Sequence, residues 1–222
     1  MQDILQFGQG YSLLFDWHHL QLPFSTMVPK GKSRPPGMVK ILEAITQLLE
    51  KKEFEAITWA EIAKTAGVNE GLIYKYFKTS RNLLHVVLHD FMHPFLVEIE
   101  TDLKGIEGSL NQLRRLIWLH FDLYASNRVL AKILLLEVRN FPGYFDSDIY
   151  QGIQGYGRQI LEIIDRGIQN GEIHQDIVAK DLRQIILGSI EHLCLPKIIF
   201  GRPISPDELT VSCCNILFRQ IG

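Results

Sequence analysis

The chain has 222 residues, with 23 basic and 25 acidic side chains for a net charge of −2, and it contains 3 cysteines. This length allows one large or two small domains with a sizeable core. The cysteines, two of them adjacent, do not form a spaced disulfide framework, and no apolar run reaches the length of a membrane span. The N-terminus lacks the positive charge and the cleavage site of a signal peptide. We therefore expect a soluble, cytoplasmic protein with no membrane partner.

Residues 1–37 mix aromatic residues with turn formers and end in a basic, Pro/Gly-rich stretch that contains Lys30, Lys32 and Arg34. We expect a leader and basic linker here. One interpretation is an arm that follows a nucleic-acid backbone, as arms do beside other DNA-reading helices. The other is a disordered leader, or upstream sequence that precedes a true start at Met27 or Met38.

Two short helices with a tight turn between them are predicted after a supporting helix over residues 38–52, whose apolar residues recur at helical spacing. Thr58 and Glu61 have the spacing of a capping box, in which hydroxyl and carboxylate satisfy backbone donors at a helix start. Gly67 is expected to end this helix in the left-handed conformation. Asn69 then caps the next helix. This is the pattern of a helix-turn-helix.

The second helix of the pair has one apolar face and one polar face. Ile73 and Phe77 lie one turn apart, so we expect both to be buried and their neighbours to face outward. A helix-turn-helix presents such a helix to the major groove of double-stranded DNA. The candidate DNA-binding residues are Thr58, Trp59, Asn69, Glu70, Leu72, Tyr74, Lys75, Tyr76, Lys78 and Arg81.

Residues 39–84 resemble the TetR family of bacterial repressors. The motif is carried by Ile62-Ala63, Ala66-Gly67-Val68, Asn69, Gly71, Ile73, Tyr74 and Phe77. The resemblance implies a homodimer that binds a palindromic operator. It also implies a DNA-binding domain at residues 38–84 and a helical domain at 85–222 that binds an effector and dimerises. The distribution of charge has the sign expected if the N-terminal part binds DNA. Residues 1–84 carry 10 basic and 8 acidic side chains, and the remainder carries 13 basic and 17 acidic side chains.

The chain departs from the family pattern at two positions within the motif region. Glu53 stands where the family usually has a helix-ending glycine. Ser80 stands where it usually has a lysine that grips a phosphate, and Lys78 or Arg81 could take that role. A long segment also precedes the first helix.

The rest of the chain predicts further helices and no strands, so the fold class is all-α. A helix that starts near Thr79 and Ser80 is expected to be interrupted by Pro94, which removes a backbone donor and would produce a kink there. The last two helices should form a four-helix interface between protomers, with Ile186 and Ile190 at the contact. The further helices are expected at about 109–126, 128–140, 144–170, 178–200 and 206–220.

An effector site is implied in the C-terminal domain by the family resemblance, and aromatic residues recur there. Each is also explained as ordinary core, because aromatic residues dominate core burial. Segments 137–142, 166–172 and 187–191 look similar to TetR members that control fatty-acid and acyl-CoA metabolism. We therefore expect an apolar effector, an acyl-CoA or a fatty acid. The candidate ligand-binding residues are Trp118, Phe121, Asp122, Tyr124, Phe141, Tyr156 and His192, with His120 as a further polar group.

No pattern of an enzyme or a metal centre stands out. His85, His89 and His93 recur at every fourth position, but three such imidazoles do not reach one ion on a straight helix, so we expect a polar face and no metal. Cys194 lies in an apolar run, and no phosphate loop or nucleophile elbow is found. We therefore expect a ligand-responsive transcriptional regulator, a repressor without a cofactor. The alternative is a helical small-molecule-binding or interaction protein that does not bind an operator.

Overall fold

The computed structural model describes residues 34–140 and 143–221. Phe141 and most of the expected leader and basic linker lie outside these residues. Within them the secondary structure is helical and contains no strand, which confirms the all-α prediction. No helix in this part of the chain is long and apolar enough to cross a membrane.

Three helices and a short turn form the N-terminal part, here called the head. The turn contains buried Phe54, whose ring anchors it. The contacts run mainly from α1 to α2, and also from α1 to α3 and from α2 to α3, so α1 supports the other two. The elements are α1 (Pro36–Leu49), η2 (Phe54–Ala56), α2 (Trp59–Ala66) and α3 (Glu70–Tyr76).

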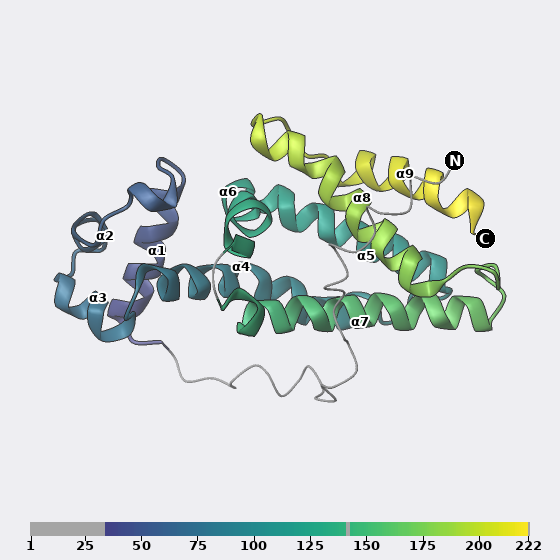
Figure 1. The fold of residues 1–222 in the computed structure, drawn as a ribbon, viewed down its shortest axis with the longest axis horizontal. Coiled ribbons are helices and arrows are strands. Elements are labelled where there is room, and N and C mark those ends of the chain that lie inside the picture. Colours follow the sequence, from purple (N-terminus) through teal and green to yellow (C-terminus); the bar gives the residue numbers. More distant parts are fainter. Residues whose placement is uncertain (1–33, 141–142, 222) are drawn as a thin grey trace, which may run out of the picture. The chain divides into compact units, whose positions relative to one another are not determined.

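Helix α4 (Ser80–Asp102) runs from the head to the helices of the body, as Figure 1 shows. It starts where the sequence predicts, and the Thr79 hydroxyl accepts a hydrogen bond from the backbone N–H of Asn82. Pro94 lies inside it, so the predicted interruption is wrong. Proline leaves the carbonyl of Asp90 without its helical donor. Burial of Met92, Phe95 and Leu96 on either side of the exposed proline keeps the helix continuous.

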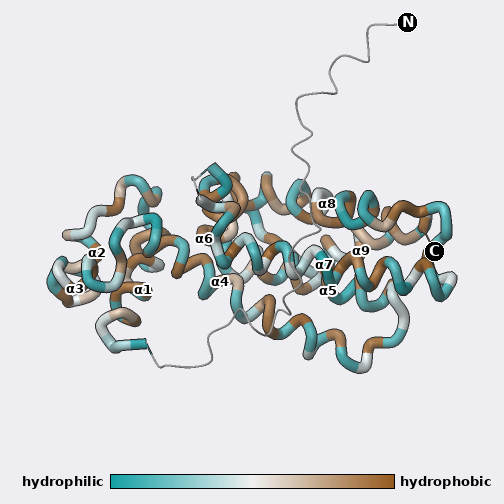
Figure 2. The backbone as a smooth tube through the Cα atoms, turned by 60° about the horizontal axis from the view of Figure 1, so that its bottom comes forward, coloured by the Kyte–Doolittle hydropathy of each residue, from teal (hydrophilic) through white to brown (hydrophobic). Residues whose placement is uncertain are grey.

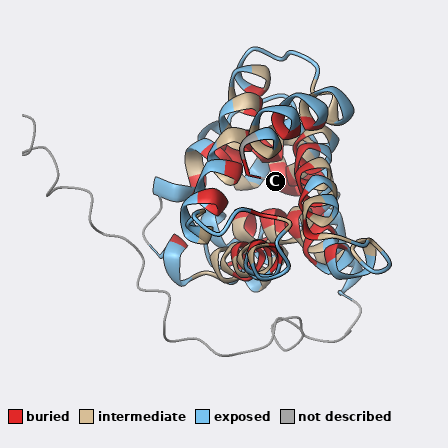
Figure 3. Cartoon of the chain, turned by 90° about the vertical axis from the view of Figure 1, so that its right-hand side faces the viewer, coloured by how far each residue is buried: buried red, intermediate tan, exposed pale blue. Residues whose placement is uncertain are grey.

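The body consists of helices α5 to α9 with short irregular turns. Helix α5 lies at its centre and contacts α4, α6, α7, α8 and α9. Buried residues face the spaces between these helices, as Figure 3 shows, and Phe121 and Ile117 of α5 are among the most deeply buried. The helices are α5 (Ser109–Ser126), α6 (Arg128–Lys132), α7 (Asp148–Gln169), α8 (Ala179–Ile199) and α9 (Pro206–Leu217).

The helix predicted over 128–140 changes type twice. Helix α6 is followed by a π-helical turn, η3 (Ile133–Glu137), and then by a 3₁₀ turn, η4 (Val138–Asn140). The helix predicted over 144–170 begins as a separate 3₁₀ turn, η5 (Tyr144–Asp146), because the Ser147 side chain caps α7 anew. The last predicted helix ends in a further turn, η6 (Phe218–Gln220).

Candidate functional site

The start of α2 is fixed by the predicted capping box. The backbone N–H of Glu61 donates to the Thr58 hydroxyl at 3.2 Å, and the backbone N–H of Thr58 donates to the Glu61 carboxylate at 3.1 Å. Lys52 also pairs with Glu61. Its hydrogen bond, with that from Thr58, lowers the pKa of the Glu61 carboxyl. The carboxylate therefore stays charged at the helix N-terminus, where negative charge is favourable.

The turn between α2 and α3 has the geometry that the sequence predicts. Gly67 adopts φ 64° and ψ 38°, and the N–H of Val68 donates to the carbonyl of Ala63 at 3.0 Å. Only glycine takes this left-handed conformation without a steric cost from Cβ. The Asn69 side chain then accepts from the N–H of Leu72 at 2.8 Å and starts α3. Both caps thus hold the two helices in their relative orientation.

Helix α3 buries one face and exposes the other. Ile73 and Phe77 are buried, as predicted, and they hold the helix against the head. Leu72 and Tyr76 are half-buried, and both lie close to Gly37 at the start of α1. Tyr76 and Leu72 therefore help to pack the head, whatever their role toward DNA. The exposed candidates are Thr58, Asn69, Glu70, Tyr74, Lys75, Lys78 and Arg81.

An aromatic pair lies on the exposed side of the motif. The ring centroids of Trp59, the first residue of α2, and Tyr74 of α3 are 5.4 Å apart. Tyr74 is 53% exposed. Lys75 follows it on α3, with Lys78 and Arg81 just beyond the end of that helix. Phosphate oxygens are bound by lysine and arginine, and base edges are read by side chains of a helix that enters the groove. The outer face of α3 therefore has side chains suited both to binding phosphates and to reading base edges.

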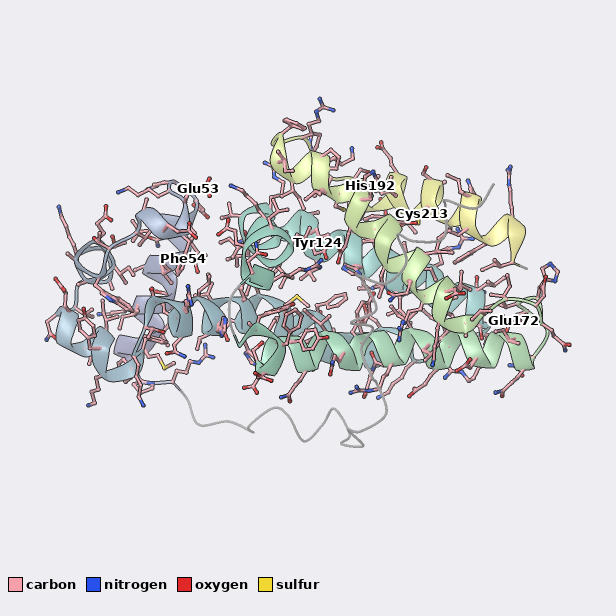
Figure 4. The ribbon with its side chains drawn as sticks, in the orientation of Figure 1. Glu53, Phe54, Tyr124, Glu172, His192 and Cys213 are labelled. Atoms are coloured by element: carbon pink, nitrogen blue, oxygen red, sulfur yellow. The ribbon has the colours of Figure 1, made fainter. Side chains whose placement is uncertain are left out.

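The interior of the body contains a polar pair among aromatic rings. His120 Nδ1 and the Tyr156 hydroxyl share a hydrogen bond at 3.1 Å between α5 and α7. The rings of Phe95, Tyr124 and Tyr156 surround the imidazole of His120, with centroids 4.8–5.7 Å from it. Burial lowers the pKa of His120 to about 3 and raises the pKa of Tyr156, so both groups are neutral at pH 7. Figure 4 labels Tyr124 in this interior.

The candidate ligand residues do not all meet there. Phe121, Tyr124 and Tyr156 are buried in the body, so these three can line an interior site. Asp122 and His192 are exposed and do not line it, because each lies on the outward side of its helix. Figure 4 labels His192 on α8.

Trp118 has a different environment from the interior candidates. Its indole N–H donates to the Asp207 carboxylate at 2.6 Å, and the guanidinium of Arg115 lies 4.7 Å from the centroid of its ring. Arg115 in turn pairs with Asp102 at 2.6 Å. Trp118 therefore joins α5 to the start of α9 at the side of the body.

Phe95, whose ring contacts the interior pair, is not among the candidates from sequence, although it recurs at helical spacing with Met92 and Ile99.

Two of the three repeated histidines of α4 lie beside each other, since the ring centroids of His89 and His93 are 5.5 Å apart. His89 Nδ1 lies 3.5 Å from the Asp90 carboxylate, and the Arg34 guanidinium pairs with that same carboxylate. His85 is half-buried, and burial lowers its pKa, with a smaller contribution from the positive charge of Arg81. Among residues 34–140 and 143–221, no cluster of three or more potential ligands has the arrangement of a metal site.

Two family models match the chain and together span residues 41–198. Residues 41–87 match the family described as bacterial regulatory proteins, tetR family. Residues 88–198 match the family described as YsiA-like protein, C-terminal region. The boundary between them falls within α4, near the beginning of the part that enters the body.

Individual relatives and solved structures also match most of the chain. The fatty acid metabolism regulator protein of Bacillus subtilis is 30% identical over 160 residues, which are 72% of this chain and 82% of the relative. The solved structure of the transcriptional regulator FadR from Bacillus subtilis in complex with stearoyl-CoA aligns with a TM-score of 0.73 at 27% identity. It covers 83% of this chain and 99% of that one. The fatty acid degradation regulator FadR from Bacillus halodurans shares the fold, with a TM-score of 0.72 at 22% identity over 84% of this chain and 97% of that one. The chain belongs to the TetR family of bacterial DNA-binding transcriptional regulators.

Proposed function

We propose that this regulator is a homodimeric repressor whose operator binding is controlled by an acyl-CoA. The observation that carries the proposal is the 30% identity to a Bacillus subtilis regulator of fatty acid metabolism over most of both chains, body included. A related solved structure holds stearoyl-CoA. The site of action would be the cytoplasm, where a bacterial chromosome and acyl-CoA thioesters are both found.

The interior of the body supports an apolar effector. Phe95, Phe121 and Tyr124 supply apolar surface, and the neutral pair of His120 and Tyr156 supplies polar groups. Apolar walls with a few polar groups are typical of small-molecule sites. A long acyl chain would have to separate these packed side chains. Because α4 and α7 both contribute rings to the cluster, separation would displace α4, the helix that begins at the head.

The outer surface of the last two helices supports dimerisation. Exposed apolar residues lie there, among them Ile185 of α8 and Val211 and Ile216 of α9. Figure 2 shows hydrophobic stretches along both helices. Ile186 and Ile190, which the sequence placed at this interface, are instead buried inside the protomer against its own helices. The contact between protomers would therefore involve the neighbouring, outward face of α8.

The operator contacts would come from the DNA-binding domain at residues 38–84, and the helical domain at residues 85–222 would hold two such domains apart. One short helix offers little interface, and a rigid dimer gives two such helices access to successive major grooves, roughly 34–36 Å apart. Tyr74, Lys75, Lys78 and Arg81 would make the outer contacts, with Trp59 beside Tyr74.

The proposal is tested by operator selection from genomic fragments followed by ligand titration. Palmitoyl-CoA and stearoyl-CoA are expected to release the bound operator at lower concentrations than octanoyl-CoA, and CoA alone or the free acids should be weaker. Trp118 joins α5 to α9, so its fluorescence, in a variant with Trp17 and Trp59 replaced by Phe, would report a shift of these helices when ligand binds the free protein. An operator complex that no acyl-CoA dissociates, with unchanged fluorescence, would exclude acyl-CoA control. Failure to retain any fragment would favour the alternative of an interaction protein.

A further inference from the structure

An ion pair joins the head to the body. Glu53 lies just before the η2 turn, and both of its carboxylate oxygens accept hydrogen bonds from Lys132 Nζ, at 2.8 and 2.9 Å. Lys132 is the last residue of α6 in the body. Figure 4 labels Glu53 on this side of the head.

The surroundings of the pair are a cleft rather than a packed interface. A cleft of about 410 Å³ lies between the turn of the head and α6, with Phe54, Ile133 and Ile198 among its lining residues. Lys132 and Glu53 also line it. Where a cleft separates two parts, a charge pair across it can set their orientation although it adds little to overall stability.

Lys132 also faces acidic groups besides its direct partner. Burial and the negative charges of Glu55 and Glu53 raise the pKa of the Glu137 carboxyl, and the charge of Lys132 opposes that rise. One oxygen of Glu137 is buried without a hydrogen-bond partner. Glu137 ends the π-helical turn that begins directly after Lys132. Lys132, Glu53 and Glu137 line the same cleft, so the ammonium group lies near acids of both the head and the body.

We propose that Lys132 is a positioning residue for operator binding: by neutralising Glu53 on the head and Glu137 on the body, it fixes the orientation of the DNA-reading head on its protomer. Without this ammonium group, Glu53, Glu55 and Glu137 repel one another across the cleft and the head turns more freely. Without Glu53, Lys132 still neutralises the remaining acids. Loss of Lys132 therefore has the larger effect. The inference rests on dimeric operator binding and is independent of the identity of the effector.

The experiment measures operator affinity and the preferred distance between half-sites. Wild-type protein and the variants Glu53→Gln, Glu53→Gly, Lys132→Gln and Glu53→Lys/Lys132→Glu are titrated onto the selected operator. Each is also titrated onto versions with one base pair added to or removed from the centre. Asp102→Asn, which breaks the ion pair with Arg115 away from this cleft, is the matched control. Melting temperatures identify any variant that fails to fold.

The wild type should discriminate strongly between the spacings. Lys132→Gln should lose affinity by up to about fivefold per protomer and should accept altered spacings more readily, with smaller effects for the two Glu53 variants. The reversed pair should restore the wild-type preference, and Asp102→Asn should retain it. Unchanged spacing preference in Lys132→Gln and both Glu53 variants, or a reversed pair no better than Lys132→Gln, would overturn the proposal. Failure of the wild type to bind DNA would refute the proposed function instead.

Discussion

The ring of Trp59, at the first position of α2, lies against the ring of Tyr74 on the exposed face of α3, with 5.4 Å between their centroids and 50° between their planes. Tyr74 is half-exposed, so without a neighbour it would occupy several rotamers. The indole limits that freedom and orients the phenol outward. The two helices of the motif are thus linked on the exposed side of α3 as well as through their buried residues.

Replacing the indole tests this orientation. Trp59→Ala should weaken operator binding by about two- to tenfold, the range of an aromatic pair, because Tyr74 must then be ordered at the moment of binding. Trp59→Phe should retain most of the affinity. In a Tyr74→Ala background the effect of Trp59→Ala should largely disappear, as a double-mutant cycle measured by gel shift would show. Additive losses would mean that Trp59 binds DNA independently of Tyr74.

Lys75 should act through its charge. It is exposed on α3 beside Tyr74. If its ammonium group meets a phosphate, Lys75→Ala should weaken binding to all operators and reduce the slope of log K against log salt by about 0.9 for each phosphate that the lysine neutralises. If it meets a guanine, preference at one base pair should relax instead. Unchanged affinity at moderate salt would exclude Lys75 from the interface; Lys104, in the turn after α4, provides a control lysine away from the head.

The head could be predicted from sequence because its signals are local. Thr58 with Glu61, Gly67 and Asn69 each determine backbone geometry within three or four residues, and all of them adopt the predicted geometry. The spacing of Ile73 and Phe77 likewise predicts their burial.

The body was less predictable because its decisive contacts join distant residues. The sequence made Trp118 a candidate ligand-binding residue, yet its indole N–H donates to Asp207, 89 positions away. Pro94 is locally a helix breaker, but packing on both sides of it prevails. The pairing of Glu53 with Lys132 spans 79 positions, and no local rule relates these residues.

A side chain added at Gly67, in the turn of the motif, should destabilise the protein through backbone strain and not through a steric clash with other residues. Apart from Gly67 and its chain neighbours, no heavy atom lies within 4 Å of the position that a Cβ on Gly67 would take, but its φ is +64°. Gly67→Val should therefore cost more than about 1–2 kcal/mol, since a β-branched residue is especially unfavourable there. We expect no operator binding in a protein that still dimerises. Gly67→Asn, which tolerates this conformation, should be milder. Normal binding and melting of the valine variant would contradict this.

Two substitutions to aspartate can distinguish residues of the dimer interface from residues of the protomer core. Ile216 is 70% exposed on α9, whereas Ile186 of α8 is 1% exposed. Ile216→Asp should give a folded monomer if α9 lies in the interface, because an unpaired carboxylate buried there costs several kcal/mol. Ile186→Asp should destabilise the protomer itself. Light scattering and circular dichroism distinguish these outcomes. A fully dimeric Ile216→Asp protein would move the interface away from this part of α9.

His120 should make the body sensitive to mild acid. Its pKa is about 3 in the folded protein because of burial, below the ordinary value of 6.5. Because this pKa is lowered, the unfolded chain binds a proton at His120 in mild acid and the folded chain does not. Above about pH 6.5 neither state binds that proton, so His120 adds no pH dependence to the free energy of unfolding. As the pH falls from there toward 3, the free energy of unfolding decreases by up to about 1.4 kcal/mol per pH unit.

Replacing His120 should remove this part of the pH dependence. His120→Gln keeps a polar group that can bond to Tyr156, but it cannot titrate. Urea unfolding at pH 7.5, 6.5, 5.8 and 5.2 should show the wild type losing stability relative to the variant below pH 6.5, with a nearly constant difference above it. The range avoids most carboxylate titration, and the other histidines are common to both proteins. Parallel curves for the two proteins would show that the His120 imidazole gains its proton as readily in the fold as in the unfolded chain.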